Sequence, residues 1–406
     1  MQKFEKHSPV VVTEVTTKHE LRQFMQYPNR LYADNPNYIP SFYGDDLSDW
    51  TPGKNPAFDY CEARCWLVRR DGEIVGRIGA ILSHKANDKF GTHRMRFSQV
   101  DFVDDSEVSA ALFGTVERWA REKGCDQVHG PLGFTDMDRE GMLVEGFDRR
   151  SLFFTNYNAP YYLEHLTRLG YRKDVDWIEY RITVPEPGGA EAERLHKLSE
   201  FILKRKHLHV ATVHHKSEYG PFVRQVFELV NAAYAPLYGV VELSDEQIER
   251  YANKFIPLVD PDFVCFVVDE QDQLVAFGVT ALDPSVALKH SDGRLFPFGW
   301  AGVLNDLHHS DTLIMLLTAV RPDLQAEGIN AVMMDHVCQS CNRHGVRFAE
   351  TGPMLELNDH ILAQWKRLEK EQHKRRRCFI KDLDHDVNAA NAAAAQTETP
   401  ETESAE

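Results

Sequence analysis

A short loop between a predicted strand and a predicted helix carries the residues best suited to bind a phosphate. Residues 312–320 form an apolar run that predicts a buried strand, and apolar residues recur at helical spacing between 329 and 344. Unpaired N–H groups at a helix N-terminus attract anions, and a glycine lets a phosphate approach the backbone. The alternative is an ordinary strand-to-helix turn with one glycine. The predicted phosphate contacts are Val320, Gln325, Ala326, Glu327, Gly328, Ile329 and Asn330.

The order of the predicted elements occurs twice along the chain, which indicates an internal duplication. Each copy has a hairpin, a strand, a helix and a short strand, and the short strands end in Gly130-Pro131 and Gly352-Pro353. With 406 residues the chain is too long for one ordinary core. We expect an amino-terminal domain of residues 1–186, a carboxy-terminal domain of residues 187–384, and a disordered acidic tail of residues 385–406.

Several motifs resemble the GNAT acyltransferase superfamily. The Gln-x-x-Gly-x-Asn loop at 325–330 is similar to its pyrophosphate loop, although Asn330 replaces the usual small residue, and residues 162–171 resemble the end of a GNAT domain. Residues 141–147 and 157–162 resemble motifs of tandem-GNAT bacterial proteins, some of which look like ceramide-type synthases that join a fatty acyl group to a long-chain amine. The resemblance implies an α/β (α+β) fold of two tandem GNAT-like domains, each a mixed central sheet flanked by helices.

The resemblance assigns acyl-CoA binding to the second copy. It implies acyl-CoA as a co-substrate rather than a permanently bound cofactor, and it implies that Asn358 contacts the pantetheine. Trp365 stands where the family has a tyrosine that protonates the departing thiolate, and an indole is a poor general acid. The matching loop of the first copy, residues 102–108, has three acids and no glycine, so it would repel a pyrophosphate. We therefore expect the first copy to shape the substrate site.

Carboxylates and tyrosines are the candidate catalytic groups for transfer of an acyl group from a thioester to an amine. Such transfer needs a base for the amine proton and an acid for the sulfur. The candidate bases are Glu350, Asp101 and Glu140, and the candidate acids are Tyr162 and then Tyr157. The acids, asparagines and tyrosines of residues 130–162 suit recognition of an amine or hydroxyl acceptor, and a long solvated loop is the alternative.

Composition narrows the class of protein. Hydrophobic content of 43% and charged content of 27% are typical of a soluble globular protein, and a net charge of −16 argues against general nucleic-acid binding. The seven cysteines are scattered and odd in number, as reduced cytosolic thiols are. Cys338-x-x-Cys341 lies within a predicted helix, where packing is favoured over a zinc or redox role, so no metal site is expected. No signal peptide or membrane span is predicted, which favours the cytoplasm, with peripheral membrane contact through Lys374–Arg377 as an alternative.

The sequence thus predicts an acyl-CoA-dependent N-acyltransferase that moves an acetyl or fatty acyl group to an amine, with a long-chain amino lipid among the candidate acceptors. Two alternatives stay open. One is an acyl-CoA-binding protein without catalysis on a tandem GNAT frame, which the residues Asn330 and Trp365 favour. The other is an aminoacyl transferase of the Fem type, against which the negative charge speaks. The acceptor, the acyl length and the oligomeric state stay open.

Overall fold

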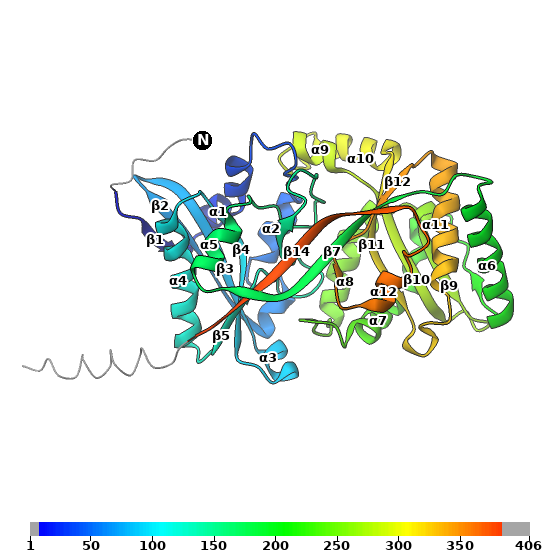
Figure 1. Ribbon diagram of the computed structural model, residues 1–406, viewed down its shortest axis with the longest axis horizontal. Coiled ribbons are helices and arrows are strands. Elements are labelled where there is room, and N and C mark those ends of the chain that lie inside the picture. Colours follow the sequence, from blue (N-terminus) through cyan, green and yellow to red (C-terminus); the bar gives the residue numbers. More distant parts are fainter. Residues whose placement is uncertain (1–7, 384–406) are drawn as a thin grey trace, which may run out of the picture.

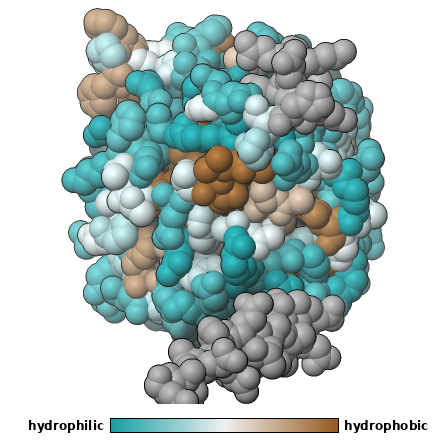
Figure 2. Space-filling view, turned by 90° about the vertical axis from the view of Figure 1, so that its left-hand side faces the viewer, coloured by the Kyte–Doolittle hydropathy of each residue, from teal (hydrophilic) through white to brown (hydrophobic). Residues whose placement is uncertain are grey.

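The computed structural model describes residues 8–383 as two lobes joined by one long mixed sheet (Figure 1). The predicted disordered tail of residues 385–406 lies outside the described residues. Figure 2 shows the end of the amino-terminal lobe, whose surface is mainly hydrophilic with a hydrophobic patch near the centre of the view. We refer to the segments 8–183 and 190–383 as the amino-terminal and carboxy-terminal halves.

The helices and strands follow the order that the sequence predicts, with several additions. The amino-terminal half contains β1 (Val11–Glu14), α1 (Lys18–Leu31), α2 (Tyr43–Asp49), η1 (Pro56–Asp59), β2 (Cys61–Arg70), β3 (Glu73–Ser83), α3 (His84–Phe90), β4 (Arg94–Phe102), α4 (Ser106–Glu122), β5 (Gln127–Gly130), β6 (Met142–Glu145), α5 (Tyr162–Arg168) and β7 (Arg172–Thr183). Its predicted hairpin turns at Asp71 and Gly72, which both have positive φ, as a tight turn requires.

The carboxy-terminal half repeats this order with two additional helices, α9 and α10. Its elements are α6 (Ala190–Lys206), β8 (His209–Val210), η2 (Lys216–Tyr219), α7 (Gly220–Tyr234), α8 (Asp245–Phe255), η3 (Ile256–Leu258), η4 (Pro261–Phe263), β9 (Val264–Val268), β10 (Leu274–Leu282), α9 (Ser285–His290), α10 (Gly299–His309), β11 (Thr312–Val320), η5 (Pro322–Leu324), α11 (Asn330–His344), β12 (Phe348–Glu350), β13 (Met354–Leu355), α12 (Asp359–Ala363) and β14 (Lys370–Asp382). Ser244 and Gln247 form a capping box at the start of α8.

The two halves exchange their last strands at the centre of the sheet. The 14-stranded sheet has the order β1-β2-β3-β4-β5-β14-β7-β12-β11-β10-β9-β8, with β6 and β13 paired beside it. Strand β14, at the end of the carboxy-terminal half, pairs with β5 of the amino-terminal half, while β7 pairs with β12. The two long strands β7 and β14 cross side by side between the lobes (Figure 1). The sheet runs across the predicted boundary at residue 186, and that boundary stays a prediction.

A buried cluster of charges holds the exchanged strands together. Lys374 and Arg376 of β14 both bind the carboxylate of Glu179 on β7, at 3.2 and 2.5 Å. All three side chains are completely buried. Despite the loss of hydration, the two cations lower the pKa of Glu179 from 4.5 to about 2. Because an unpaired buried charge is costly, this cluster makes the exchanged arrangement depend on all three groups.

A β-bulge occurs at the matching position in each half of the sheet, next to the place where two strands separate. In β11 the register shifts between Val279–Leu317 and Thr280–Met315, so Leu316 is an extra residue. The register of β4 shifts in the same way, between Arg77–Asp101 and Gly79–Ser98. A β-bulge bends its strand away from a neighbour. The predicted duplication therefore extends to the bulge, and only the carboxy-terminal gap contains a large pocket among those found in the described residues.

Candidate functional site

A large, mainly apolar pocket lies where β11 and β12 separate. The two parallel strands pair only from Thr312–Phe348 to Ile314–Glu350. Beyond this point β12 ends, and α11 lies over the gap. The space amounts to about 730 Å³, part of it open to solvent. Its lining is Ile182, Val184, Pro185, Leu195, Gly278, Thr280, Met315, Leu317, Thr318, Asn330, Met333, Met334, Val337, Cys338, Cys341, Ala349, Gln364, Trp365 and Leu368.

The predicted phosphate loop lies at one end of this pocket with its amides free. Within the described residues, the backbone N–H groups of Ala326, Gly328, Ile329 and Asn330 have no acceptor. Ala326 and Gly328 have positive φ values of 65° and 84°, which turn the chain into α11. Four free donors at the positive end of a 15-residue helix form a strong attraction for an anion.

Side chains around the loop leave these amides accessible. The amide of Gln325 donates to the carbonyl of Val320 at 3.2 Å, so it stabilises the turn instead of pointing outward. Glu327 binds Lys206 of α6 at 2.7 Å, and this contact lowers the pKa of the Glu327 carboxyl. Ile202 packs against Gly328, since a Cβ added at residue 328 would lie 3.0 Å from the Cδ1 of Ile202. The acid in the loop is therefore partnered by a cation of α6.

The opposite end of the pocket is closed by Trp365. Its indole N–H points to the sulfur of Met354 at 3.1 Å, and the ring lines the pocket. Asn358 accepts a hydrogen bond from the N–H of Ile361 at 3.3 Å and caps α12. The side chain of Asn358 is outside the pocket lining. The pantetheine contact that the resemblance implies for Asn358 stays a prediction.

The two cysteines of α11 also line the pocket. Burial raises the pKa of Cys338 to about 11 and that of Cys341 to about 12, so both are thiols at neutral pH. Among the described residues, the group of metal-ligating side chains that lie together contains neither of them. They contribute apolar surface to the pocket and to the packing of α11.

Glu350, a predicted base, ends β12 at the mouth of the gap. Its carboxylate binds Arg181 at 3.0 Å and Lys374 at 3.3 Å. Both cations come from the exchanged strands, Arg181 from β7 and Lys374 from β14. The role of Glu350 as a base stays a prediction.

The other predicted groups lie in the amino-terminal half. Tyr162 is fully buried, and its hydroxyl accepts from the N–H of Phe102 at 2.7 Å. Asp101 binds Arg77 at 2.7 Å, and Tyr157 accepts from Asn35 at 2.6 Å. None of the three lines the large pocket.

The matching loop of the amino-terminal half is closed to anions. The carboxylate of Asp105 accepts from the N–H groups of Glu107 and Val108, so it occupies the start of α4. Tyr162 fills the space beside the end of β4, stacked on Phe102. These contacts explain why, of the two matching loops, the one in the carboxy-terminal half keeps helix amides free to bind an anion.

The acidic loop, which we define as residues 136–140 of the amino-terminal half, faces the other side of β11. Met137 packs in the same hydrophobic cluster as Leu316, the bulge residue. The hydroxyl of Tyr234 donates to the carbonyl of Thr318 at 2.8 Å, and burial, together with the charge of Asp136, raises the Tyr234 pKa to about 12. The acidic loop therefore lies within electrostatic reach of the gap.

Two carboxyls of this loop have raised pKa values. Loss of hydration raises the pKa of Asp136 to about 6 and that of the half-buried Glu140 well above its ordinary value, and neighbouring acids add to both effects. Such carboxylates are better proton acceptors than ordinary ones. Glu140 is a predicted base, whereas Asp136 was not singled out. The sequence shows Asp136 as an acid within a Gly-rich stretch. It does not show that this side chain is buried, because burial depends on distant segments of the chain.

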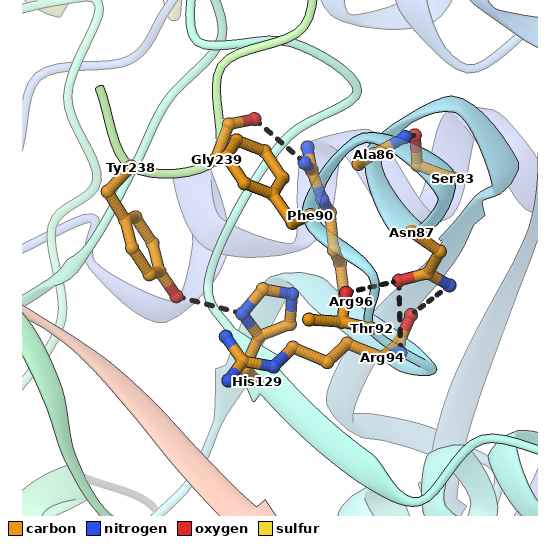
Figure 3. Close-up of a pocket in the computed structure, with 10 residues that line it drawn as sticks. All are labelled: Ser83, Ala86, Asn87, Phe90, Thr92, Arg94, Arg96, His129, Tyr238 and Gly239. Carbon is orange, nitrogen blue, oxygen red and sulfur yellow. Dashed lines mark hydrogen bonds between the residues drawn. The ribbon is translucent and has the colours of Figure 1, made fainter. Parts of the chain in front are cut away.

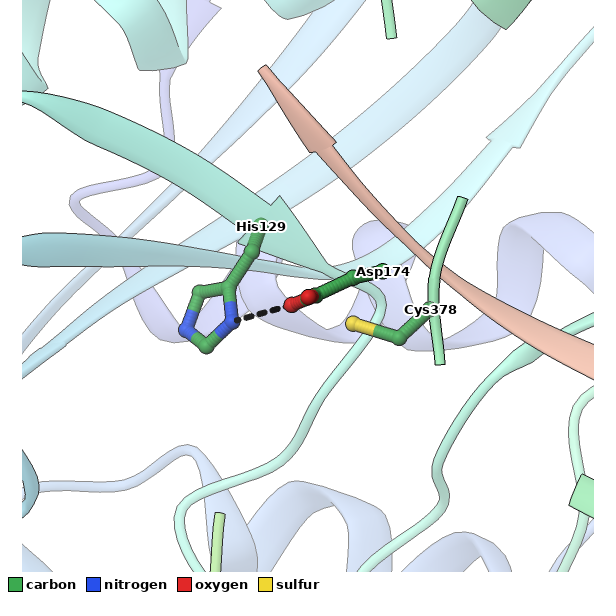
Figure 4. A group of neighbouring side chains, drawn as sticks. All are labelled: His129, Asp174 and Cys378. Atoms are coloured by element: carbon green, nitrogen blue, oxygen red, sulfur yellow. Dashed lines mark ion pairs between the residues drawn. The ribbon is translucent and has the colours of Figure 1, made fainter. Parts of the chain in front are cut away.

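A second, smaller pocket lies between α3 and the segment at Tyr238 (Figure 3). In its wall the hydroxyl of Tyr238 contacts His129 at 2.9 Å and Cys378 at 3.5 Å, and it donates to Asp174. Figure 4 shows His129, Asp174 and Cys378 together. Burial lowers the pKa of His129 to about 4. Because the tyrosine hydroxyl already satisfies all three side chains, the group is explained as a hydrogen-bonded cluster.

Comparison with solved structures places this architecture among tandem GNAT proteins. A tandem GNAT protein from the clavulanic acid biosynthesis pathway aligns with a TM-score of 0.52 and 13% identity, over 92% of this chain and 99% of that one. A GCN5-related N-acetyltransferase from Sphaerobacter thermophilus aligns with a TM-score of 0.50 and 13% identity, over 92% and 96%. The protein has the tandem GNAT fold, as the sequence predicts.

Two protein sequences are more similar to the chain than these solved structures are. The chain is 27% identical over 379 residues to Protein YghO of Escherichia coli, covering 92% of this chain and 95% of that protein. It is 28% identical over 300 residues to a bacterial ceramide synthase of Caulobacter vibrioides, covering 72% and 75%. No family model matches the chain.

The helices of residues 8–383 are short or polar compared with a membrane-spanning helix. None of them combines the length and the apolar character that crossing a bilayer requires.

Proposed function

We propose that the protein is an acyl-CoA-dependent N-acyltransferase that joins a fatty acyl group to a long-chain amine. The observation that carries the proposal is the apolar gap between β11 and β12, which ends at the free amides of α11. In this arrangement the free amides of Ala326, Gly328, Ile329 and Asn330 bind the pyrophosphate, and the pantetheine arm runs into the gap. The relative of Caulobacter vibrioides, named as a ceramide synthase, favours a long-chain amine as acceptor.

The lining of the gap favours a fatty acyl donor over an acetyl donor. Its walls are mainly aliphatic side chains, methionines and cysteines, which offer an acyl chain an apolar surface. On the other side of β11, Phe154 lies close to Gly352 and belongs with Leu316 to the same apolar cluster as Ile314. A long-chain acceptor can use this second apolar surface.

The reaction follows from this placement. The amine nitrogen attacks the thioester carbonyl carbon, a new C–N bond forms, and the C–S bond breaks to release the CoA thiolate. Beyond Ile314 the edge of β11 that faces β12 has no strand partner among the described residues, so N–H groups on that edge can polarise the carbonyl. Asp136 or Glu140 takes the amine proton. A thiolate is a good leaving group, which lessens the need for the acid that Trp365 cannot supply.

The direct test is acyl transfer with purified full-length protein. We expect acyl-CoAs to raise the melting temperature more as the acyl chain lengthens, because each buried methylene adds apolar contact. We also expect CoA release, detected as free thiol, only when a long-chain amine is added. Stabilisation without thiol release would support the alternative of a binding protein without catalysis, and absence of both would contradict the proposal.

Removing an acidic-loop carboxylate is expected to slow transfer strongly. A general base contributes roughly 10²–10⁴-fold to a rate, so Asp136→Asn or Glu140→Gln, whichever residue is the base, should lower kcat by about this factor with little change in KM for acyl-CoA. The acidic limb of the pH–rate profile should disappear in the same variant. With Asp136 as base, wild-type activity should rise as the pH passes about 6, where this carboxyl ionises.

The matched control is Glu122→Gln, which removes an exposed carboxylate of α4. It should leave kcat unchanged. If both loop variants keep wild-type kcat and the same pH profile, neither carboxylate is the base.

A further inference from the structure

The helical hairpin formed by α9, the loop 291–298 and α10 has an unusual surface. Two phenylalanines of its loop, Phe296 and Phe298, are each 81% exposed. Next to them Trp300 is 47%, Leu304 46% and Val286 50% exposed. Large apolar side chains exposed singly are ordinary, but five on one small motif call for an explanation. In Figure 1 the two helices lie along the upper edge of the molecule.

The aromatic tip is held in place by backbone hydrogen bonds. The N–H of Trp300 donates to Leu295 at 2.8 Å, and that of Arg294 donates to Ser291 at 2.9 Å. The indole N–H of Trp300 is satisfied by the carbonyl of Pro297 at 3.1 Å. At Gly293, with φ of 75°, a Cβ would collide with the backbone of Ser41. The loop is therefore a rigid element that presents its aromatic rings outward.

The balance of charged residues in this hairpin differs from that of the chain as a whole. The whole chain carries −16, whereas residues 285–310 contain two lysine or arginine residues, Lys289 and Arg294, and two acids, Asp292 and Asp306. The carboxylate of Asp306 is occupied by the N–H of Ala287 at 2.7 Å. An acidic protein is repelled by an anionic lipid surface, and its neutral apolar part is the part that can approach it.

The inner face of the hairpin leads toward the gap. Ala287, Leu288 and Val303 are buried in one cluster with Ile314 of β11. Phe154 and Leu316, on the acceptor side of β11, pack against that cluster. The buried side of the hairpin is thus continuous with the apolar side chains near the acceptor side of β11.

We propose that this hairpin docks the protein on the surface of a phospholipid bilayer, with Phe296 and Phe298 inserted among the lipids. Aromatic side chains favour the interface between headgroups and acyl chains, and insertion of a short apolar motif needs no membrane span. The idea that docking brings the long-chain acceptor to the site rests on the proposed function, whereas docking itself requires no catalysis.

The test is flotation of the full-length protein with vesicles of phosphatidylcholine, with and without a minority of phosphatidylglycerol, in the absence of CoA and acceptor. We expect the wild-type protein to float with both. The double variant Phe296→Ser/Phe298→Ser should bind roughly tenfold or more weakly, because it loses most of the inserted apolar surface. The control Phe201→Ser removes a 57% exposed phenylalanine of α6 and should float like the wild type.

Two further measurements separate the alternatives. The double variant should keep the wild-type melting temperature and its rate on a long-chain amine dispersed in detergent micelles, and should lose rate only on the same amine held in vesicles. Vesicle binding without transfer would leave the docking inference standing and remove the proposed function. Failure of the wild type to float, or equal flotation of the double variant, overturns the inference. So does a dimer that dissociates on mutation while flotation is unchanged, since a second copy would then cover the hairpin.

Discussion

Replacing Val337 with tryptophan is expected to abolish acyl-CoA binding. Val337 lies in the middle of α11 and lines the gap between β11 and β12. An indole at this position occupies the space that the pantetheine arm and acyl chain would take, and a packed wall on the other side leaves it no room to move aside. We expect acyl-CoA affinity to fall on the order of a hundredfold or more, measured by calorimetry.

The control for this variant lies on the same helix. Gln339→Trp adds the same indole at an exposed position of α11 and should leave affinity within about twofold of the wild type. Val337→Ala keeps the gap open and should bind acyl-CoA with a modest loss. If Val337→Trp folds and binds acyl-CoA as the wild type does, the ligand lies elsewhere.

Replacing Glu179 with glutamine is expected to destabilise the protein by about 3–5 kcal/mol, because Lys374 and Arg376 stay buried while their shared anion is lost. Glutamine has nearly the same shape, so packing changes little. Denaturant unfolding measures the loss as a lower midpoint at unchanged slope.

Glu371→Gln is the control on the same strand. Glu371 is 52% exposed and binds Arg149 at 2.5 Å, so its removal should cost less than about 1 kcal/mol. Equal stability of the two variants would show that the buried cluster is dispensable.

The same cluster predicts acid sensitivity. The folded protein holds the pKa of Glu179 at about 2, below the 4.5 of an unfolded chain. The stabilisation is therefore complete above pH 4.5 and is lost as the pH falls from there toward 2, by about 3 kcal/mol from this group. Unfolding free energies of the wild type and Glu179→Gln should converge over that range. A constant difference between them down to pH 2 would contradict this origin of the effect.

The local elements of the site could be predicted from the sequence, because short-range signals specify them. The apolar run of β11, the loop with Gly328 and the spacing of α11 lie within 33 consecutive residues, Thr312–His344. A turn of this kind is determined by its own residues. The free amides and the open gap agree with the predicted binding loop, whose role in binding CoA stays a prediction.

What depends on distant partners could not be predicted in the same way. The cations that neutralise Glu350 come from β7 and β14, and nothing near Glu350 in the chain indicates them. Tyr162 matches a family motif, yet it is buried against Phe102 because the first copy has filled its own gap. The raised pKa of Asp136 arises from burial. Helices α9 and α10 were missed because Gly299 and the aromatic loop interrupt their pattern.

The strand exchange has a consequence for synthesis on the ribosome. Strand β5 pairs with β14, whose residues 370–382 are translated long after those of β5. Until β14 emerges from the ribosome, the amino-terminal lobe lacks the strand that pairs with β5, and the edge of β5 is uncovered. Uncovered edges recruit foreign strands. The newly made chain should therefore need protection, for instance by a chaperone, until β14 has been translated.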